Sequence, residues 1–245
     1  MSASATLNRV LRYLQASSVP RTRPRVLRVI GHDRSVFTQG LCFVGDELYE
    51  SAGGWGMSSL RRLNVNTGES VESLPLPNDF AEDIAFDGDM LHQLTWTSGR
   101  LLHYSLHPLT LVGESSFGHE GWGLARHRSH LLVSDGTSLL RRYTSDMQLV
   151  LERRVLCRGL PMRHLNAMDV VGDDLFVVLW CTPWIARVDL RTLRVHQILD
   201  CTELVAIESP GNVHHILNGL AHCKSRNSLF VTGKHWSRMF EIALG

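Results

Sequence analysis

The sequence predicts an all-β fold, a β-propeller of five blades, and three observations predict it. Beyond about residue 26 the apolar residues show no helical period, and short apolar segments alternate with turn signals such as Val44-Gly45-Asp46. A unit of two apolar strands around a polar turn recurs five times. The last unit also stops one strand short of the others. A repeat of about four strands and 40 to 45 residues is typical of a propeller blade.

Five equivalent apolar residues define the repeat, and each lies near the start of its unit. The spacings between them are 43, 40, 44 and 52 residues, and the residues are Leu41, Ile84, Leu124, Met168 and Leu220. Each unit continues into a third strand, and the first four units continue into a fourth. A β-sandwich is the alternative, but it predicts short strand spacings without a four-strand period.

The ends of the chain complete this arrangement. The fifth unit reaches Gly245 after three strands, and segment 25–32, RVLRVIGH, has the pattern of the missing fourth strand. We expect that strand to join the last blade and close the ring, which leaves only short, protected edges. The chain therefore divides into an N-terminal extension, residues 1–24, which is flexible or carries a short helix over 7–14, and one β-propeller domain, residues 25–245.

Composition excludes several classes of protein. The chain has 245 residues, of which 44% are hydrophobic, so it can bury a full core. Its 25 basic residues balance 24 acidic ones, and no apolar run is long enough to span a membrane. We therefore expect a soluble protein with no nucleic-acid partner and no membrane partner. A monomer is expected as well. The five cysteines form no C-x-x-C pair and are expected to be reduced core residues.

The N-terminal segment bears on the cellular compartment. Its first 32 residues contain six arginines and no acidic residue, but they lack the apolar core of a secretory signal. We therefore expect a cytoplasmic protein. The Ser-rich, Arg-rich composition also suits an organelle transit peptide, and a short amphipathic surface helix is the other interpretation.

The repeat also predicts where a functional site lies, because the innermost strands of a propeller surround a central channel. Residues two positions before each repeat-defining residue are Gln39, Glu82, Trp122, Asn166 and Asn218. Residues twelve positions after it are Gly53, Trp96, Gly136 and Trp180, with Lys234 in the fifth unit after a longer turn. We expect these ten positions to gather at one end of the channel.

The residue types at these positions favour function over packing. Positions that only pack would repeat one type, yet here a carboxylate, carboxamides, an amine and three tryptophans share them. Lys234 is one of only two lysines in the chain, which indicates a requirement for a compact ammonium. The alternative is that Asn and Gln cap turns while Trp fills gaps between blades. For Asn218, which precedes Gly219, a turn role explains the residue equally well.

Tryptophan is also frequent close to these positions. Trp55, Trp184 and Trp236 follow the second set within two to four residues. Together with the three at repeat positions, they predict an apolar, partly dry cage that suits a short aliphatic group with polar ends. Burial against indoles should raise the pKa of Glu82 toward neutrality, which favours proton transfer.

Other chemistries find little support in the sequence. There is no nucleophile elbow, phosphate-binding loop or dinucleotide fingerprint, so no cofactor is expected. His214-His215 invites a metal interpretation, but no metal-ligand spacing with nearby carboxylates accompanies it, and we expect no metal. Cys181 is a candidate nucleophile next to Trp180, although a buried, unreactive cysteine is the better interpretation because no histidine is placed to face it.

Several strings in the chain resemble the plant and bacterial type of glutaminyl cyclase, the glutaminyl-peptide cyclotransferases. They occur in collinear order and are FTQGL (37–41), LYESAG (48–53), FAED (80–83), QLTW (93–96), EGWGL (120–124), SDG (134–136), IARVD (185–189), LNGLA (217–221) and FVTGKHW (230–236). The resemblance implies a five-bladed propeller that acts on peptides or proteins with N-terminal glutamine, releases ammonia and needs no metal. The chain departs from the family pattern at Ala81, Asp83 and Ala167.

The resemblance also assigns site residues. It implies catalytic roles for Gln39, Glu82, Asn166 and Lys234, and substrate binding by Phe37, Phe80, Trp96, Trp122 and Trp180. As a hypothesis, Glu82 takes a proton from the substrate α-amine and passes it to the departing nitrogen, while the other three polar groups supply donors to the developing oxyanion.

Two alternative functions remain open from the sequence. One is a propeller that only binds a peptide terminus or a small ligand. The other is a lactonase-like propeller with a metal held by Glu82, Asn166 and Asn218, which Lys234 argues against because a cation would repel the metal.

Overall fold

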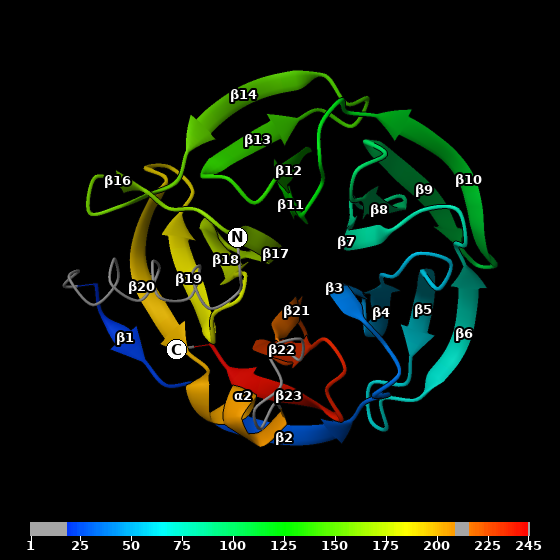
Figure 1. The fold of residues 1–245 in the computed structure, drawn as a ribbon, viewed down its shortest axis with the longest axis horizontal. Coiled ribbons are helices and arrows are strands. Elements are labelled where there is room, and N and C mark those ends of the chain that lie inside the picture. The colour runs from blue at the N-terminus through cyan, green and yellow to red at the C-terminus, as the bar shows by residue number, and fades with distance from the viewer. Residues whose placement is uncertain (1–18, 209–215, 245) are drawn as a thin grey trace.

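A computed structural model describes residues 19–208 and 216–244, and these form five sheets arranged in a ring around a central axis (Figure 1). This architecture confirms the prediction of an all-β propeller. The short helix expected over residues 7–14 lies outside the described residues. Among the residues that are described, no helix is long and apolar enough to cross a membrane.

Three regular four-stranded sheets follow one another along the chain, and in each the strands pair antiparallel in sequence order. The first contains β3 (Thr38–Val44), β4 (Glu47–Ala52), β5 (Ser59–Leu63) and β6 (Ser70–Pro75). The second contains β7 (Ala81–Phe86), β8 (Leu91–Thr95), β9 (Arg100–Leu106) and β10 (Leu109–Ser116). The third contains β11 (Gly123–His127), β12 (His130–Ser134), β13 (Leu139–Tyr143) and β14 (Leu149–Arg154).

The last sheet combines both ends of the chain. It contains β21 (Leu217–Cys223), β22 (Ser228–Gly233), β23 (Arg238–Ala243) and, at its outer edge, β2 (Val26–Gly31). β2 pairs antiparallel with β23, with Val29 opposite Phe240. The predicted pairing of segment 25–32 with the last repeat is therefore observed.

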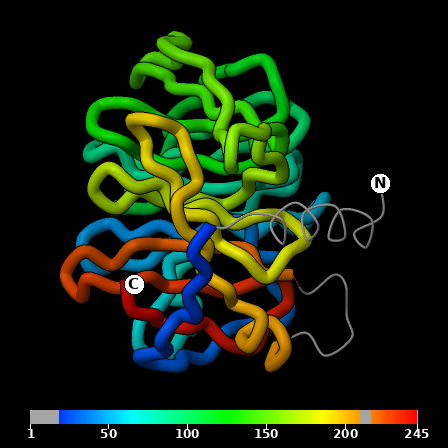
Figure 2. Tube along the Cα trace, turned by 90° about the vertical axis from the view of Figure 1, so that its left-hand side faces the viewer, coloured from blue at the N-terminus to red at the C-terminus, as the bar shows by residue number. Residues whose placement is uncertain are grey.

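The remaining sheet departs from the predicted four-strand unit because it has seven strands. Its regular part is β17 (Leu165–Val171), β18 (Asp174–Leu179), β19 (Trp184–Asp189) and β20 (Arg194–Asp200), and the added strands are β15 (Leu156–Cys157), β16 (Leu160–Pro161) and β1 (Arg21–Thr22). β1 pairs parallel with β20 along its outer side (Figure 2). Val19 is buried in the same sheet's core, so residues 19–24, assigned to the extension from the sequence, pack against the propeller.

A short helix, α2 (Thr202–Glu208), follows β20 and accounts for part of the longest repeat spacing. Glu208 at its end is buried and accepts hydrogen bonds from the backbone N–H of Ser237, at 2.6 Å, and from Arg238 Nη1, at 3.1 Å. These bonds attach the helix to the connection between β22 and β23. Seven residues span only two turns, too few for a helical period to be visible in the sequence.

Neighbouring sheets pack against each other in five apolar clusters, each of which combines residues from two adjacent sheets. Leu41 and Leu48 of the first sheet, for example, pack with Phe230 and Met239 of the last. Each such fully buried side chain contributes about 1.5–3 kcal/mol of hydrophobic stabilisation. The innermost strands also contact one another in the order β3, β7, β11, β17, β21 and back to β3. Equivalent positions of different repeats are therefore brought together around the axis.

Candidate active site

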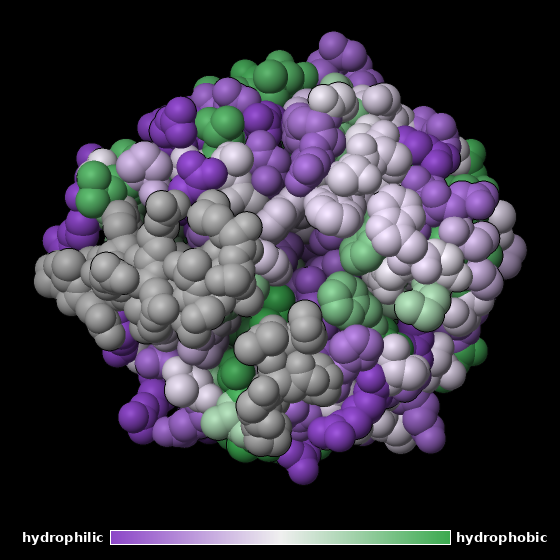
Figure 3. All heavy atoms as spheres, viewed as in Figure 1, coloured by the Kyte–Doolittle hydropathy of each residue, from purple (hydrophilic) through white to green (hydrophobic). Residues whose placement is uncertain are grey.

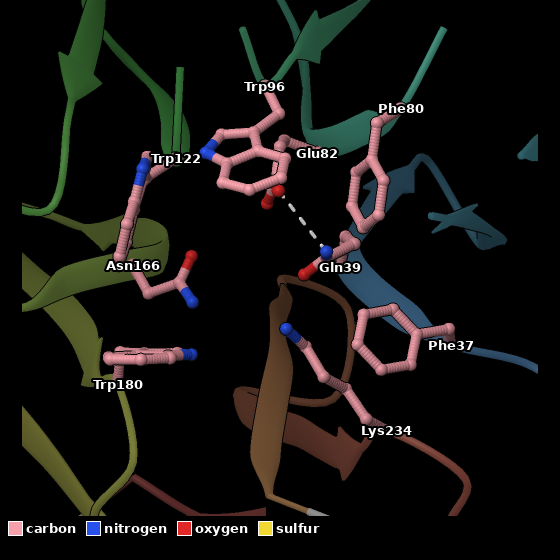
Figure 4. Close-up of a pocket in the computed structure, with 9 residues that line it drawn as sticks. All are labelled: Phe37, Gln39, Phe80, Glu82, Trp96, Trp122, Asn166, Trp180 and Lys234. Atoms are coloured by element: carbon pink, nitrogen blue, oxygen red, sulfur yellow. Dashed lines mark hydrogen bonds between the residues drawn. The ribbon is translucent and has the colours of Figure 1, made fainter. Parts of the chain in front are cut away.

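The nine site residues predicted from the sequence line a single pocket of about 190 Å³ at one end of the central channel (Figure 4). They are Phe37, Gln39, Phe80, Glu82, Trp96, Trp122, Asn166, Trp180 and Lys234. The four polar side chains are at most 7% exposed, whereas all five aromatic residues are partly exposed. The pocket therefore has polar groups at its floor and aromatic rings at its mouth.

Irregular strand pairing places the polar residues. In β3, β7, β17 and β21 the register with the next strand shifts at Gln39, Glu82, Asn166 and Asn218, respectively. Such bulges release a residue from the alternation of the strand and re-aim its side chain. The same device, repeated in four sheets, directs functional groups toward the end of the channel instead of into the cores between sheets.

A second repeated feature places Phe37 and Phe80. The backbone N–H groups of Gly53 and Trp96 donate to the carbonyl oxygens of Phe37 and Phe80, both at 2.9 Å. Trp180 and Lys234 make the equivalent bonds to residues 164 and 216. The two phenylalanines thus occupy one repeat position, four residues before the repeat-defining residues. Sequence reasoning reached them only by family resemblance, although this spacing would have found them.

The same repeat position in the third unit is Glu120, which the sequence analysis missed. Its Oε2 accepts hydrogen bonds from Trp96 Nε1, at 3.2 Å, and from Trp122 Nε1, at 3.1 Å. One carboxylate therefore orients two indoles of the pocket wall from the outside. Trp122 in turn packs edge-on against Trp180, with ring centroids 5.5 Å apart.

Glu82 is the buried carboxylate of the pocket. Its Oε1 accepts a hydrogen bond of 3.2 Å from Gln39 Nε2, and its backbone carbonyl accepts one from Ser51 Oγ. Burial raises the pKa of Glu82 to about 8, with nearby Lys234 lowering it and Glu120 raising it further. A carboxyl group with such a pKa exchanges its proton near neutral pH, which is what general acid–base chemistry requires.

Lys234 points into the pocket from the end of β22, opposite Glu82 (Figure 4). Its Nζ lies 4.4 Å from the ring centroid of Phe37, which is a cation–π contact. Burial lowers the pKa of Lys234, while Glu82 and Cys181 oppose this change. The pocket thus contains two titratable groups whose pKa values are shifted toward each other.

Asn218 lies beneath the pocket and fixes the amide of Gln39. Its Nδ2 donates to Gln39 Oε1 at 2.6 Å and to the carbonyl oxygen of Thr38 at 3.3 Å. Because the Gln39 oxygen is occupied in this way, its NH₂ group faces Glu82. Asn218, for which a turn role explained the sequence equally well, therefore positions a pocket residue without lining the pocket.

Asn166 presents an unused hydrogen-bonding group. Its Oδ1 is buried and has no partner among the described residues. A buried polar atom left in this state costs free energy, and a bound ligand with an N–H group can recover it. Asn166 lies on the opposite side of the pocket from Phe37 and Phe80 (Figure 4).

The predicted places of three tryptophans are wrong. Trp184 and Trp236 do not line the pocket, because both are buried in the apolar clusters between sheets. Trp55 lies outside the pocket and packs against Phe80 with ring centroids 5.7 Å apart. Residues at the next turn of a repeat unit can face either the channel or the sheet interior, and the sequence did not distinguish these directions.

Gly53 and Gly136, the remaining repeat positions, make room for aromatic rings. A Cβ atom at Gly53 would lie 2.7 Å from Phe80 Cε1, and one at Gly136 would lie 2.8 Å from three atoms of the Trp122 indole. Neither distance is tolerated in a packed protein. These glycines therefore shape the pocket indirectly, because the absence of a Cβ atom leaves space for the rings of Phe80 and Trp122.

The described residues contain no group of three or more His, Cys, Asp or Glu side chains that could hold a metal ion. His214-His215 lies outside the described residues. All five cysteines are buried, as predicted. Burial raises the pKa of Cys181 to about 11, so its thiol is protonated and a poor nucleophile near neutral pH.

The family model described as glutamine cyclotransferase matches residues 2–244 of the chain. The chain belongs to the glutamine cyclotransferase family. It is 32% identical over 222 residues to a glutaminyl-peptide cyclotransferase of Arabidopsis thaliana, a match that covers 87% of this chain and 68% of that protein. Its structure matches the crystal structure of Myxococcus xanthus glutaminyl cyclase with a TM-score of 0.87 at 31% identity, covering 92% and 97% of the two chains. This cyclotransferase-family member is an enzyme, as the sequence predicted.

The departures from the cyclotransferase pattern lie outside the pocket lining. Ala81 and Ala167 are buried, and Ala167 belongs to an apolar cluster between two sheets. The Asp83 carboxylate accepts hydrogen bonds from the backbone N–H groups of Ile84, Leu124 and Met168. All three substitutions therefore leave the polar groups of the pocket in place.

Proposed function

We propose that the protein converts the N-terminal glutamine of peptides or proteins to pyroglutamate and releases ammonia. Membership of the cyclotransferase family supports this proposal. The observation that carries it is a buried carboxylate, Glu82, with a pKa of about 8, facing an ammonium and two carboxamides inside an aromatic pocket. A volume of about 190 Å³ is small even for a ligand pocket and suits a single residue.

The reaction is intramolecular, so the pocket needs mainly to hold the substrate folded back on itself. The α-amine nitrogen attacks the γ-carboxamide carbon, a new N–C bond closes a five-membered ring, and the original bond to the amide nitrogen breaks. Trp96, Trp122 and Trp180 contact the substrate methylenes together with the two phenylalanines. A water-poor aromatic enclosure also strengthens the polar interactions at the floor.

In the proposal Glu82 moves the proton that this reaction displaces. As a carboxylate it accepts a proton from the attacking amine, and as an acid it returns that proton to the departing nitrogen, which then leaves as ammonia. The raised pKa suits both halves, because a group that titrates near the working pH is effective as base and as acid. Gln39, held by Asn218, orients the carboxylate through its NH₂ group.

Negative charge develops on the γ-carbonyl oxygen when the ring closes. Lys234 Nζ and the amide NH₂ groups of Asn166 and Gln39 are the donors that can stabilise it, and fixed donors of this kind lower the barrier substantially. The unpartnered Asn166 Oδ1 is an acceptor for the substrate α-amine. The pocket therefore offers an acceptor for the substrate amine and donors for the substrate carboxamide oxygen, both close to Glu82.

We further propose that the reaction needs no metal ion. A single carboxylate stands in the pocket, and the buried ammonium of Lys234 opposes a cation there. In the same proposal the five sheets are the blades of one closed ring in a single domain, which keeps residues from all five repeats in register at the pocket.

The test is ammonia release from a short glutamine-initiated peptide by purified protein, with and without prior chelator treatment. Glu82→Gln is expected to lower kcat/KM by about 10²–10⁴, the range typical of acid–base groups. The control is Glu203→Gln, an exposed carboxylate that is 70% accessible, and it should leave activity unchanged.

Each outcome of this test has a distinct meaning. Full activity in a folded Glu82→Gln variant would end the assignment of Glu82 as the proton carrier. Activity lost with the chelator and restored by a metal would show that the metal-free mechanism is wrong. A folded wild-type protein that binds the peptide and releases no ammonia would be a binding propeller.

A further inference from the structure

Two cavities continue from the pocket toward the rim of the ring. The first has a volume of about 640 Å³ and shares Phe37 and Phe80 with the pocket. The second, of about 430 Å³, shares Asp33, Arg61 and Ser70 with the first. The shared lining residues place the two cavities side by side, and we call them together the downstream groove. It is bordered by the connections that precede β3, join β4 to β5 and join β5 to β6.

The proposed reaction requires such a path. An N-terminal glutamine is bonded through its carbonyl carbon to the rest of the substrate, and the pocket holds only one residue. Figure 3 shows a hollow at the centre of this face, bordered on one side by apolar side chains. We propose that the downstream groove binds the residues after the glutamine and that it favours substrates with a basic side chain among them. This inference rests on the proposed function.

The part of the groove next to the pocket is apolar. Phe37 and Phe80 meet edge-to-face with centroids 6.2 Å apart, so each ring has one side in the pocket and contributes to the groove as well. Met57, on the connection from β4 to β5, lines this part of the groove and is 76% exposed. Large apolar side chains this exposed are typical of contact surfaces. Met57 offers an apolar surface for the substrate residues that a dipeptide lacks.

Charge distinguishes the far part of the groove. Arg61 is buried and already forms two ion pairs, because its guanidinium lies 3.3 Å from both Glu50 and Asp33. His32 is paired in the same way with buried Glu50, at 2.8 Å. The carboxylates that solvent reaches are Asp33, which is 46% exposed, and Glu69. Hydrogen bonds from Ser35 hold the pKa of Asp33 below its usual value, so it is ionised at neutral pH.

The groove therefore presents two exposed carboxylates, Glu69 and Asp33, of which Asp33 also pairs with Arg61, while the cations Arg61 and His32 are buried and paired. Charge complementarity of this kind selects among ligands more strongly than it raises affinity overall. A lysine or arginine placed a few residues after the glutamine can approach Asp33 and Glu69. An acidic residue at the same place is repelled by both.

The first part of the test measures kcat/KM for glutamine-initiated peptide amides of two, four and six residues. We expect kcat/KM to rise about tenfold with length, because contacts in the groove add binding energy that the dipeptide lacks. Met57→Ala should raise KM for the hexapeptide and leave the dipeptide unchanged. Leu160→Ala is the matched control, since Leu160 is 56% exposed but belongs to another sheet.

The second part compares hexapeptides that carry either lysine or glutamate at one downstream position. We expect the wild type to prefer lysine about two- to fivefold per accessible carboxylate, the range of exposed charge pairs. Glu69→Gln and Asp33→Asn should each reduce this preference, and about 0.5 M salt should weaken it. Asp89→Asn, an exposed aspartate in the turn between β7 and β8, should leave it intact.

The dipeptide separates the two proposals. If it is turned over while kcat/KM shows no dependence on length or charge, the downstream groove does not bind the substrate and the proposed function stands. A preference that is equal in the wild type and in both carboxylate variants would overturn the charge assignment. If the dipeptide and the longer peptides all fail to release ammonia, the proposed function itself is wrong.

Discussion

At the scale of single residues, the pH dependence of activity follows from Glu82 and Lys234. Burial raises the pKa of Glu82 to about 8, so its carboxylate forms as pH rises through that value. The substrate amine loses its proton over a similar range, about 7.7–8.0. Burial lowers the pKa of Lys234 below 10.5, so its ammonium is lost at a lower pH than usual. We expect a bell-shaped profile of kcat/KM with its acidic limb near pH 8.

Two variants should move that acidic limb in opposite directions. Lys234 lowers the pKa of Glu82, so Lys234→Met should shift the limb to higher pH, whatever its effect on the maximum rate. Glu120 raises the same pKa, so Glu120→Gln should shift the limb to lower pH while its amide oxygen still accepts from the two indoles. Full pH profiles of both variants provide the check. Shifts in the same direction would show that the limb does not report Glu82.

The residues of the site could largely be predicted from sequence, because the repeat converts linear spacing into a ring. Seven of the nine lining residues were found by spacing alone, and the two phenylalanines followed from the family resemblance. The roles of Glu120 and Asn218 were not found. Both act through hydrogen bonds to another pocket residue, Glu120 to indole nitrogens and Asn218 to the Gln39 oxygen. A partner of this kind depends on side-chain direction, which spacing does not determine.

At the scale of elements, strand positions were predictable and strand register was not. Alternating apolar residues predict where a strand lies, but a bulge adds a residue without changing the residue types around it. The register shifts at Gln39, Glu82 and Asn166 are therefore invisible to the period-two pattern. The short strands β1, β15 and β16 contain two residues each, and α2 contains seven. Elements of this length carry too little periodicity to be recognised.

Asp83 links three innermost strands, and its removal should destabilise the ring. From β7, its Oδ2 accepts the backbone N–H groups of Leu124 in β11 and Met168 in β17, each at 2.9 Å. Asp83→Ala leaves these buried donors without a partner, at about 1–3 kcal/mol each. We expect a loss of about 2–5 kcal/mol in the free energy of unfolding, measured by urea denaturation.

The matched control for Asp83→Ala is Asp89→Ala, which removes an exposed carboxylate from the turn after β7 and should change stability by no more than about 0.5 kcal/mol. Equal stability of the two variants would mean that Asp83 does not hold the strands together. A loss confined to Asp83→Ala would explain why the chain carries an aspartate at a position where the family resemblance expects glycine.

At the scale of the whole molecule, strand pairing joins the N-terminal part of the chain to the last sheet. The repeat predicted that segment 25–32 pairs with the last unit, and β2 does pair with β23. The side-chain contacts of His32, directly after β2, were not predicted. Its imidazole lies between two acceptors, the carbonyl oxygen of Trp236 at 2.9 Å and the Glu50 carboxylate at 2.8 Å. Both neighbours accept hydrogen bonds, an arrangement that favours the positively charged imidazole, which donates from both nitrogens.

This buried pair joins the last sheet to the first, and its pKa shifts define when it stabilises the fold. Burial lowers the pKa of His32, but attraction to Glu50 outweighs it and raises the pKa above 6.5. Burial raises the pKa of Glu50, but His32, Arg61 and Thr38 outweigh it and hold the pKa below 4.5. The His32 contribution is complete below pH 6.5 and is lost as pH rises through the raised pKa. The Glu50 contribution is complete above pH 4.5 and is lost as pH falls through the lowered pKa.

The pair should therefore stabilise the fold most between about pH 4.5 and 6.5. In that window Glu50→Gln should cost about 3–5 kcal/mol, because it leaves buried cationic partners without their counter-charge. The difference in unfolding free energy between the variant and the wild type should shrink as pH rises above the His32 pKa. Part of it should persist, because the variant also loses the ion pair between Glu50 and Arg61. Urea denaturation of both proteins across this range, with Glu203→Gln as an exposed control, measures the effect. Stability curves that stay parallel at every pH would show that the ends of the ring are held by apolar packing and strand pairing alone.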